Sequence, residues 1–146
     1  MDPARLLMVD LPGPHLDSPT RDHLARYPFG GVCLFRRNIE SLEQTAQLVG
    51  EVRQILGPQA WVAVDQEGGM VARVLEIPLA PAAMALAATG SLELSQQVGA
   101  AVGRGLASLG INWNFAPCLD INSNPHNPIM ASAVLDGSPS RPPNWP

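Results

Sequence analysis

Four short apolar runs, each bounded by glycine or proline, constrain the fold of this chain more than any other feature of its sequence. They lie at residues 6–11, 31–35, 61–67 and 111–121 and are rich in valine, leucine and isoleucine. Apolar runs between turn residues are typical of strands that are buried on both faces, as the strands of parallel sheets are. We therefore predict four strands of a parallel sheet.

The segments between the apolar runs carry helix signals. The pair Ser18-Pro19 offers an N-cap and a proline for the first helical position. Ser41, followed three residues later by Gln44, fits a capping box, and Ser91 can cap a third helix that ends before Gly110. Strands that alternate with helices indicate βαβ units, so we predict an α/β fold.

The segment 68–90 interrupts this alternation. It is rich in alanine and proline, so we expect an extended loop with room for a helical turn. Long ordered loops at the C-terminal ends of strands carry the sites of many α/β proteins. Candidate site residues are therefore sought where the run 61–67 meets this loop.

Charge and composition argue against several classes of function. The net charge is −4 and the basic residues are scattered, so we predict no nucleic-acid surface. The first apolar run is too short for a signal peptide or a membrane span, which predicts no membrane contact and a cytoplasmic location. No glycine-rich phosphate loop follows that run, which argues against an open α/β protein that binds a nucleotide. Cys33 and Cys118 lack metal-type spacing and are interpreted as buried free thiols, and we predict no metal or cofactor.

The stretch WVAVDQEGGMVARV, residues 61–74, holds the candidate site. Side chains alternate along a strand, so Asp65 and Glu67 share one face and come last, where a strand end meets its ligand. Three interpretations are open: a catalytic pair of acids, a polar turn paired with Arg73, and a ligand-binding strand end. In sugar-cleaving enzymes the two acids flank the scissile bond, whereas neighbours on one strand point the same way, so the first interpretation is the weakest.

Three stretches also match longer patterns. VAVDQEGGMVARV is similar to apolar residues followed by Asp-Gln-Glu-Gly-Gly and two arginines three residues apart. LASLGINWNFAPCLDINSNPHNP is similar to Leu-Gly-Ile-Asn-x-Asn-Phe-Ala-Pro-x-x-Asp, and FGGVCLFRRNI to Gly-Gly-x-x-Leu-Phe-x-Arg-Asn. In this order the patterns resemble glycoside hydrolase family 3, in particular its β-N-acetylhexosaminidase branch. The resemblance covers residues 1–128, which we take as a partial barrel domain.

The resemblance implies a (β/α)8 TIM barrel, of which this chain would be the N-terminal half, because such a barrel takes about 250 residues. It implies a small carbohydrate substrate, a β-linked N-acetylglucosaminide or glucoside, in cytoplasmic recycling of cell-wall fragments. Asp65 falls on the acid that accepts hydrogen bonds from sugar hydroxyls. Arg73 falls on an arginine that donates to sugar oxygens or orients Asp65. Met70 replaces the first arginine of the pattern, which puts the contacts of that arginine in doubt.

Other residues receive structural interpretations. Glu67 is expected to order the Gly68-Gly69 turn, and Asp120 to stabilise a turn rather than contact the sugar. Trp61 and Trp113 lie within predicted strands and are expected in the core rather than stacked on a sugar. The three histidines match no catalytic histidine of the family and are expected at the surface or in turns: His15, His23 and His126.

The catalytic segments of the family do not occur in this sequence. These are a Lys-His-x-Pro-Gly-His-Gly segment, a histidine acid/base with its aspartate partner, and a late aspartate nucleophile. Retaining hydrolysis needs a nucleophile and a proton donor. We therefore assign no catalytic residue and expect the chain to be inactive alone. The alternative is a non-catalytic half-barrel that binds a sugar or a partner chain, and its open sheet edges invite self-association.

The last segment, residues 129–146, departs from the family pattern. It is rich in proline and lacks a periodic apolar face, so we expect disorder. The family would continue with Gly-x-Arg-Ser, and one set of codons that the genetic code permits for residues 130–134, ATG GCG AGC GCA GTT, contains Gly-Glu-Arg-Ser in a shifted frame. The tail is therefore hypothesised to be an out-of-frame reading. Sequencing the locus tests this, since the absence of a hexosaminidase-like continuation in every downstream frame would rule it out.

Overall fold

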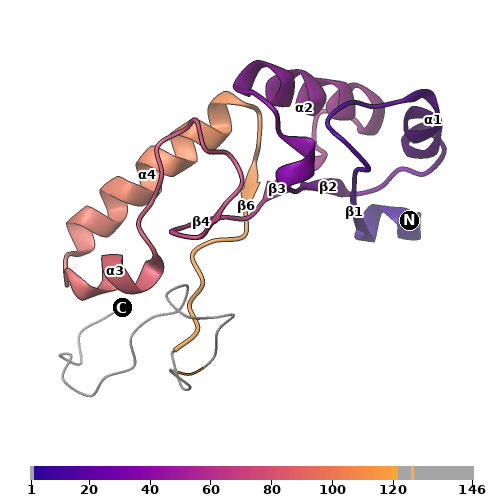
Figure 1. Ribbon diagram of the computed structural model, residues 1–146. Helices are drawn as coiled ribbons and strands as arrows, with labels where there is room; N and C mark the ends of the chain where they lie inside the picture. The colour runs from indigo at the N-terminus through magenta and orange to yellow at the C-terminus, as the bar shows by residue number, and fades with distance from the viewer. Residues whose placement is uncertain (1, 122–125, 127–146) are drawn as a thin grey trace.

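The computed structural model describes residues 2–121 and residue 126. Its central element is a parallel sheet of four strands (Figure 1). The strands are β1 (Met8–Asp10), β2 (Gly31–Leu34), β3 (Trp61–Val64) and β6 (Trp113–Asn114), in the order β1-β2-β3-β6. All three pairings are parallel. The predicted parallel sheet is confirmed, although each strand is shorter than its apolar run.

Four α-helices accompany the sheet among the described residues: α1 (Ser18–Arg26), α2 (Leu42–Leu56), α3 (Ala83–Ala88) and α4 (Leu92–Ser108). Two short 3-10 helices, η1 (Pro3–Leu6) and η2 (Arg36–Asn38), precede β1 and follow β2. The parallel strands with their crossover helices confirm an α/β fold of the partial-barrel kind.

The helix starts follow local capping chemistry. Ser41 accepts the Gln44 N–H at 3.1 Å and Ser91 accepts the Leu94 N–H at 3.1 Å, so both predicted N-caps are confirmed. The prediction for α1 is wrong by one residue. Its N-cap is Asp17, because an aspartate oxygen accepts the Thr20 N–H at 2.9 Å, and Ser18 is already helical.

The end of α4 confirms the role predicted for Gly110. Gly110 has a φ of 81°, a left-handed conformation that suits glycine. Its N–H donates to the Ala107 carbonyl at 2.9 Å, and the Ile111 N–H donates to the Leu106 carbonyl at 3.1 Å. These two bonds form a Schellman motif, which turns the chain from α4 into the approach to β6.

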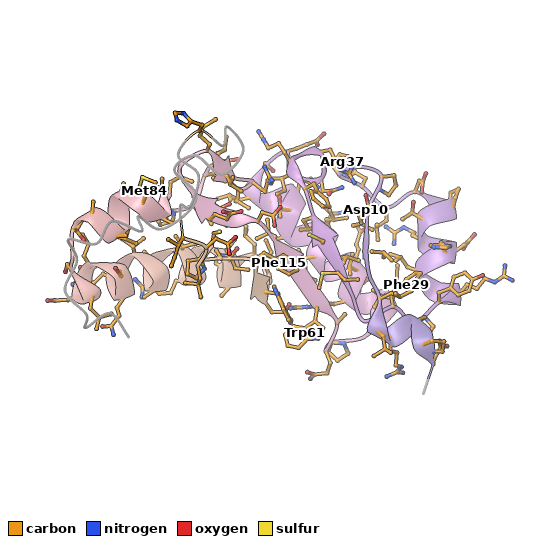
Figure 2. All side chains as sticks on the ribbon, turned by 90° about the horizontal axis from the view of Figure 1, so that it is seen from below. Asp10, Phe29, Arg37, Trp61, Met84 and Phe115 are labelled. Carbon is orange, nitrogen blue, oxygen red and sulfur yellow. The ribbon has the colours of Figure 1, made fainter. Side chains whose placement is uncertain are left out.

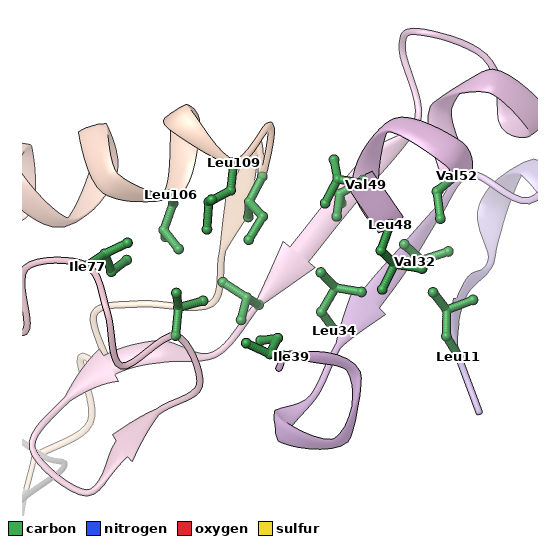
Figure 3. Packing of buried hydrophobic residues seen from close by; sticks show 14 of the residues in the cluster. Leu11, Val32, Leu34, Ile39, Leu48, Val49, Val52, Ile77, Leu106 and Leu109 are labelled. Atoms are coloured by element: carbon green, nitrogen blue, oxygen red, sulfur yellow. The ribbon is translucent and has the colours of Figure 1, made fainter. Parts of the chain in front are cut away.

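The core lies between one face of the sheet and the helices (Figure 3). The side chains of Val32, Leu34, Val62 and Val64 are fully buried on that face. They belong to one cluster with α2 residues such as Leu48, Val49 and Val52, with Leu106 of α4, and with Leu109, which directly follows α4. Burial of each such side chain contributes about 1.5–3 kcal/mol, so this layer fixes the strands against α2 and α4.

The opposite face of the sheet is open, which corrects two predictions. Trp61 and Trp113 are 46% and 42% exposed rather than in the core. They alternate with the helix-facing residues, so their rings lie on the face that no described helix covers. Cys33 and Cys118 are free, as predicted, but each is half-buried rather than buried.

The segment 68–90 contains more regular structure than the predicted loop. Strand β4 (Gln66–Gly68) pairs antiparallel with β5 (Val71–Ala72), and α3 follows before α4. The predicted disorder of 129–146 lies outside the described residues. Across residues 2–121, no helix has the length and apolar character that a membrane crossing requires.

Candidate functional site

The structure brings the two predicted ligand-binding residues together at the C-terminal end of β3. Asp65 occupies the single position between β3 and β4, and Arg73 directly follows β5. Arg73 Nη2 lies 3.3 Å from Asp65 Oδ2, and the two side chains remain 29% and 25% exposed. Residues eight apart in sequence thus form one acid–guanidinium pair that solvent can reach.

The short β4–β5 hairpin places Arg73 over Asp65. Gly68 and Gly69 have φ values of 103° and 58°, which the tight turn requires. A Cβ atom on Gly68 would lie 2.4 Å from the Pro81 carbonyl oxygen, and the Gly69 N–H donates to the Ala80 carbonyl at 3.0 Å. The hairpin is therefore packed directly against the segment that leads into α3. Met70 projects from its tip and is exposed.

Gln66, which the sequence did not single out, holds this hairpin. Its side chain is 2% exposed. Oε1 accepts the N–H groups of Arg73 and Val74 at 2.8 and 3.0 Å, and Nε2 donates to the Val74 carbonyl at 2.8 Å. These bonds fix the backbone of Arg73 beside Asp65. The hydrogen bonds that order the turn thus come from Gln66 rather than from Glu67, the residue expected to do so.

Two asparagines before and within β6 bind the backbone at the two ends of β3, and Asn114 is the one at the site. Asn114 Oδ1 accepts the Gln66 N–H at 2.9 Å, and Asn114 Nδ2 donates to the Gln66 carbonyl at 3.1 Å. Asn112 repeats this arrangement further down β3, with bonds to the Val62 N–H at 2.8 Å and to the Ala60 carbonyl at 3.2 Å. The spacing Asn-x-Asn in the sequence is the only signal that could have indicated these paired contacts.

The charge of the Asp65 carboxylate affects the pKa of two neighbouring groups, Glu67 and Cys33. Burial, and secondarily the charge of Asp65, raises the pKa of Glu67, while Arg73 opposes the shift. Burial and the Asp65 charge also raise the pKa of the Cys33 thiol. Cys33 therefore stays protonated at neutral pH and is not an activated nucleophile.

Arg73 retains a donor that the described residues do not use. Its Nε atom is buried and has no hydrogen-bond partner within residues 2–121 and 126. Buried polar atoms are satisfied in most native structures, so Arg73 Nε is an exception, as is Arg53 Nε among the described residues.

A second acid–arginine pair lies at the end of β1. Asp10 is the last residue of β1, and its carboxylate pairs with Arg37 Nη2 (Figure 2). The Arg37 guanidinium lies 5.0 Å from the centre of the Phe35 ring. Both residues were missed by the sequence analysis, although an acid at the end of an apolar run is the same signal that identified Asp65.

Asn38, next to Arg37 in sequence, holds the backbone that follows β1 and β2. Its side chain is fully buried. It accepts the Phe35 N–H at 2.8 Å and donates to the carbonyls of Leu11 and Gly13 at 3.0 and 2.9 Å. The Arg-Asn motif therefore ties the ends of β1 and β2 together.

The remaining predicted residues lie outside the Asp65–Arg73 contact. Asp120 is exposed, and its carboxylate lies 3.7 Å from Cys118 Sγ. His15 pairs with Glu40 at 3.6 Å, and the His23 ring lies 5.1 Å from that of Tyr27. All three histidines are exposed, as predicted. The described residues contain no group of three or more His, Cys, Asp or Glu side chains placed to hold a metal ion.

A family model described as the glycosyl hydrolase family 3 N terminal domain matches residues 3–134. The chain belongs to glycoside hydrolase family 3. The resemblance read from the sequence motifs is thus confirmed. A β-hexosaminidase of Methylococcus capsulatus is 38% identical over 120 residues, which are 80% of this chain and 36% of that protein.

Solved family 3 structures share the backbone arrangement. A family 3 β-N-acetylglucosaminidase from Paenibacillus sp. str. FPU-7 superposes with a TM-score of 0.81 at 38% identity, over 87% of this chain and 25% of that one. NagZ from Neisseria gonorrhoeae, in complex with N-trifluoroacetyl-D-glucosamine, superposes with a TM-score of 0.72 at 32% identity, over 79% and 36%. The family 3 chain described here thus spans about a third of the length of curated relatives such as the Methylococcus protein.

Proposed function

We propose that this chain supplies the sugar-binding half of a family 3 glycoside hydrolase site that takes a terminal β-linked N-acetylhexosamine. Asp65 and Arg73 are the proposed ligands. The observation that carries the proposal is their contact at the open end of β3, where both side chains remain accessible to solvent. The β-hexosaminidase relatives and the glucosamine-derivative complex of NagZ support the choice of sugar class.

The chemistry of this pair suits a carbohydrate. A carboxylate can accept charge-assisted hydrogen bonds from two hydroxyl groups on adjacent ring carbons. The Arg73 guanidinium holds Asp65 in place and adds donors for a sugar oxygen. Such a site favours ligands that carry matching hydroxyl groups, because the carboxylate and guanidinium lose hydrogen bonds when a ligand lacks them.

We assign no catalytic residue to this chain. Asp65 lies between β3 and β4 and Glu67 lies two residues further on, within β4. Nothing in the geometry of the described residues places these two acids on either side of one bond, as a retaining enzyme requires at a separation of about 5–5.5 Å. The proposed activity of the isolated chain is therefore binding without turnover. As part of a complete site, the chain would serve hydrolysis in carbohydrate metabolism, with cytoplasmic recycling of cell-wall fragments as the proposed setting.

Titration with N-acetyl-D-glucosamine, followed by NMR chemical-shift changes, tests the proposal. We expect Asp65→Asn and Arg73→Gln each to weaken binding by about tenfold to a hundredfold, since each removes a charge-assisted hydrogen bond. Asp22→Asn, at an exposed position of α1, is the matched control and should bind as the wild type does. Equal affinity of all variants would refute the assigned ligands.

An activity assay tests the second half of the proposal. We expect no hydrolysis of a chromogenic β-N-acetylglucosaminide by the purified 146-residue chain. Hydrolysis that disappears in Asp65→Ala would contradict binding without turnover and would make the chain an enzyme by itself.

A further inference from the structure

The Asp65–Arg73 ion pair does not hold its own geometry. Its two charged atoms are 3.3 Å apart, and both side chains remain partly exposed. An ion pair that solvent can reach contributes little by itself, because water screens the charges and the side chains lose conformational freedom when they pair. The placement of both residues must therefore come from the backbone that carries them.

Two successive residues, Asn114 and Phe115, hold the backbone on either side of Asp65. The Phe115 N–H donates to the Val64 carbonyl at 3.0 Å. One residue beyond Asp65, the Asn114 side chain accepts the Gln66 N–H at 2.9 Å and donates to the Gln66 carbonyl at 3.1 Å. Asp65 is therefore fixed between two contacts with the end of β6.

The carboxamide of Asn114 bonds to the chain at the point where β3 leaves the sheet. Val64 is the last residue of β3 and pairs with Asn114 in the strand register. Beyond this pair the chain forms β4, and the carboxamide supplies one donor and one acceptor to the peptide groups on both sides of the Gln66 Cα atom. Two bonds to one residue define both its position and its orientation.

Gln66 transmits this constraint to Arg73. Its buried side chain accepts the N–H groups of Arg73 and Val74 and donates to the Val74 carbonyl. Asn114 thus lies at the start of two short connections. One leads to the backbone of Asp65, and the other leads through the Gln66 amide to the backbone of Arg73.

We propose that Asn114 is a positioning residue for the Asp65–Arg73 pair and that it acts through Gln66. A binding site needs its ligand-contacting groups held within about 0.5 Å of the productive geometry by the residues behind them. Loss of the Asn114 bonds frees Gln66, and with it the backbone of both members of the pair. The consequence for sugar affinity rests on the proposed function, whereas the constraint on the backbone does not.

Asn112 provides a matched control, because it makes the same two kinds of bond at the other end of β3. Its side chain accepts the Val62 N–H at 2.8 Å and donates to the Ala60 carbonyl at 3.2 Å. Asn112→Ala and Asn114→Ala each remove two side-chain bonds to the chain that forms β3, but only Asn114→Ala removes them beside Asp65. A difference between the two variants therefore reports position rather than the number of bonds lost.

Amide hydrogen exchange, measured by NMR, tests the backbone constraint without any ligand. We expect the Arg73 N–H to exchange about fivefold or more faster in Asn114→Ala than in Asn112→Ala, because its Gln66 acceptor is no longer fixed. If Asn114→Ala does not fold, Asn114→Asp replaces it, since it keeps the acceptor for the Gln66 N–H and loses only the donor. Compared with Asn112→Asp, it should change the rate in the same direction. Equal Arg73 exchange rates within a matched pair would overturn the proposal.

Titration with N-acetyl-D-glucosamine tests the consequence for the site. We expect Asn114→Ala to raise the dissociation constant by about fivefold or more, and Asn112→Ala by less than about twofold. In a Gln66→Met background the effect of Asn114→Ala should shrink, because the connection to Arg73 is already broken.

Two results of the titration would overturn the proposal. One is equal affinity of the wild type and Asn114→Ala. The other is an undiminished effect of Asn114→Ala in the Gln66→Met background, which would show that Asn114 does not act through Gln66. A wild type that binds no sugar would instead refute the proposed function, and the exchange rates of the Arg73 N–H would still decide the role of Asn114.

Discussion

At the scale of the residue, one buried amide decides the geometry of the candidate site. Both polar atoms of the Gln66 side chain form hydrogen bonds with the backbone of residues 73 and 74. The Asn114 side chain in turn accepts a hydrogen bond from the backbone N–H of Gln66. The sequence indicated Asp65 and Arg73 because acids and arginines are recognisable ligands. It could not indicate Gln66, because an amide between two acids carries no signal until the fold shows what it touches.

Replacing Gln66 should therefore affect both stability and binding. Gln66→Met removes three hydrogen bonds and leaves buried backbone groups of Arg73 and Val74 unpaired. We expect a loss of about 2–4 kcal/mol in the free energy of unfolding, measured with urea, and weaker sugar binding in the fraction that folds. Gln97→Met, at an exposed position of α4, is the control and should change stability by less than about 0.5 kcal/mol. A loss no larger than that of the control would refute the role of the amide.

Glu67 gives the site a pH-dependent contribution to stability. Its pKa in the folded chain is raised above the ordinary value of 4.5, chiefly by burial. The protonated form is therefore favoured by folding, so the contribution is fully present below pH 4.5 and is lost as pH rises through the raised pKa. We expect Glu67→Gln to gain stability over the wild type as pH rises from 4.5 toward 7 in urea unfolding. A difference that shrank over that range would contradict the direction of the shift.

At the scale of the element, the ends of the two longest helices were largely predictable and the strand ends were not. The caps at Ser41, Ser91 and Gly110 follow from local chemistry that the sequence displays directly. The run 61–67 was expected as one strand, but the chain leaves the sheet after Val64 and pairs with β5 instead. That break depends on Gln66 and on the close packing of Gly68 against residues 80 and 81. The pattern of apolar residues along a strand does not reveal contacts with residues this far along the chain.

Two glycines associated with α4 should respond in opposite ways to the same substitution. Gly110→Ala forces a Cβ atom into the left-handed region, 3.0 Å from a Val49 methyl group, and should cost about 1–2 kcal/mol. Gly99→Ala lies within the helix with nothing within 4 Å of the new Cβ, and should add about 0.5–1 kcal/mol. Urea unfolding of both variants checks the pair. Equal signs would mean that Gly110 does not terminate α4 as described.

At the scale of the whole molecule, the four parallel strands and their helices correspond to part of a family 3 barrel. The alternation of strand and helix signals was sufficient to predict parallel pairing, and the family motifs were sufficient to predict a barrel. The exposure of Trp61 and Trp113 was not predicted, because an apolar residue in a strand is normally covered on either face of a parallel sheet. Their exposure follows only from the number of strands that the described chain provides.

The attachment of β6 differs in kind from that of the other strands. Between β1, β2 and β3 the ladders consist of main-chain groups, which every residue except proline supplies. Across the seam between β3 and β6, the carboxamides of Asn112 and Asn114 add bonds of their own to the facing main chain. The attachment of β6 thus depends partly on two particular side chains, those of Asn112 and Asn114. We expect their replacement to weaken the pairing of β6 with β3 while β1, β2 and β3 stay paired.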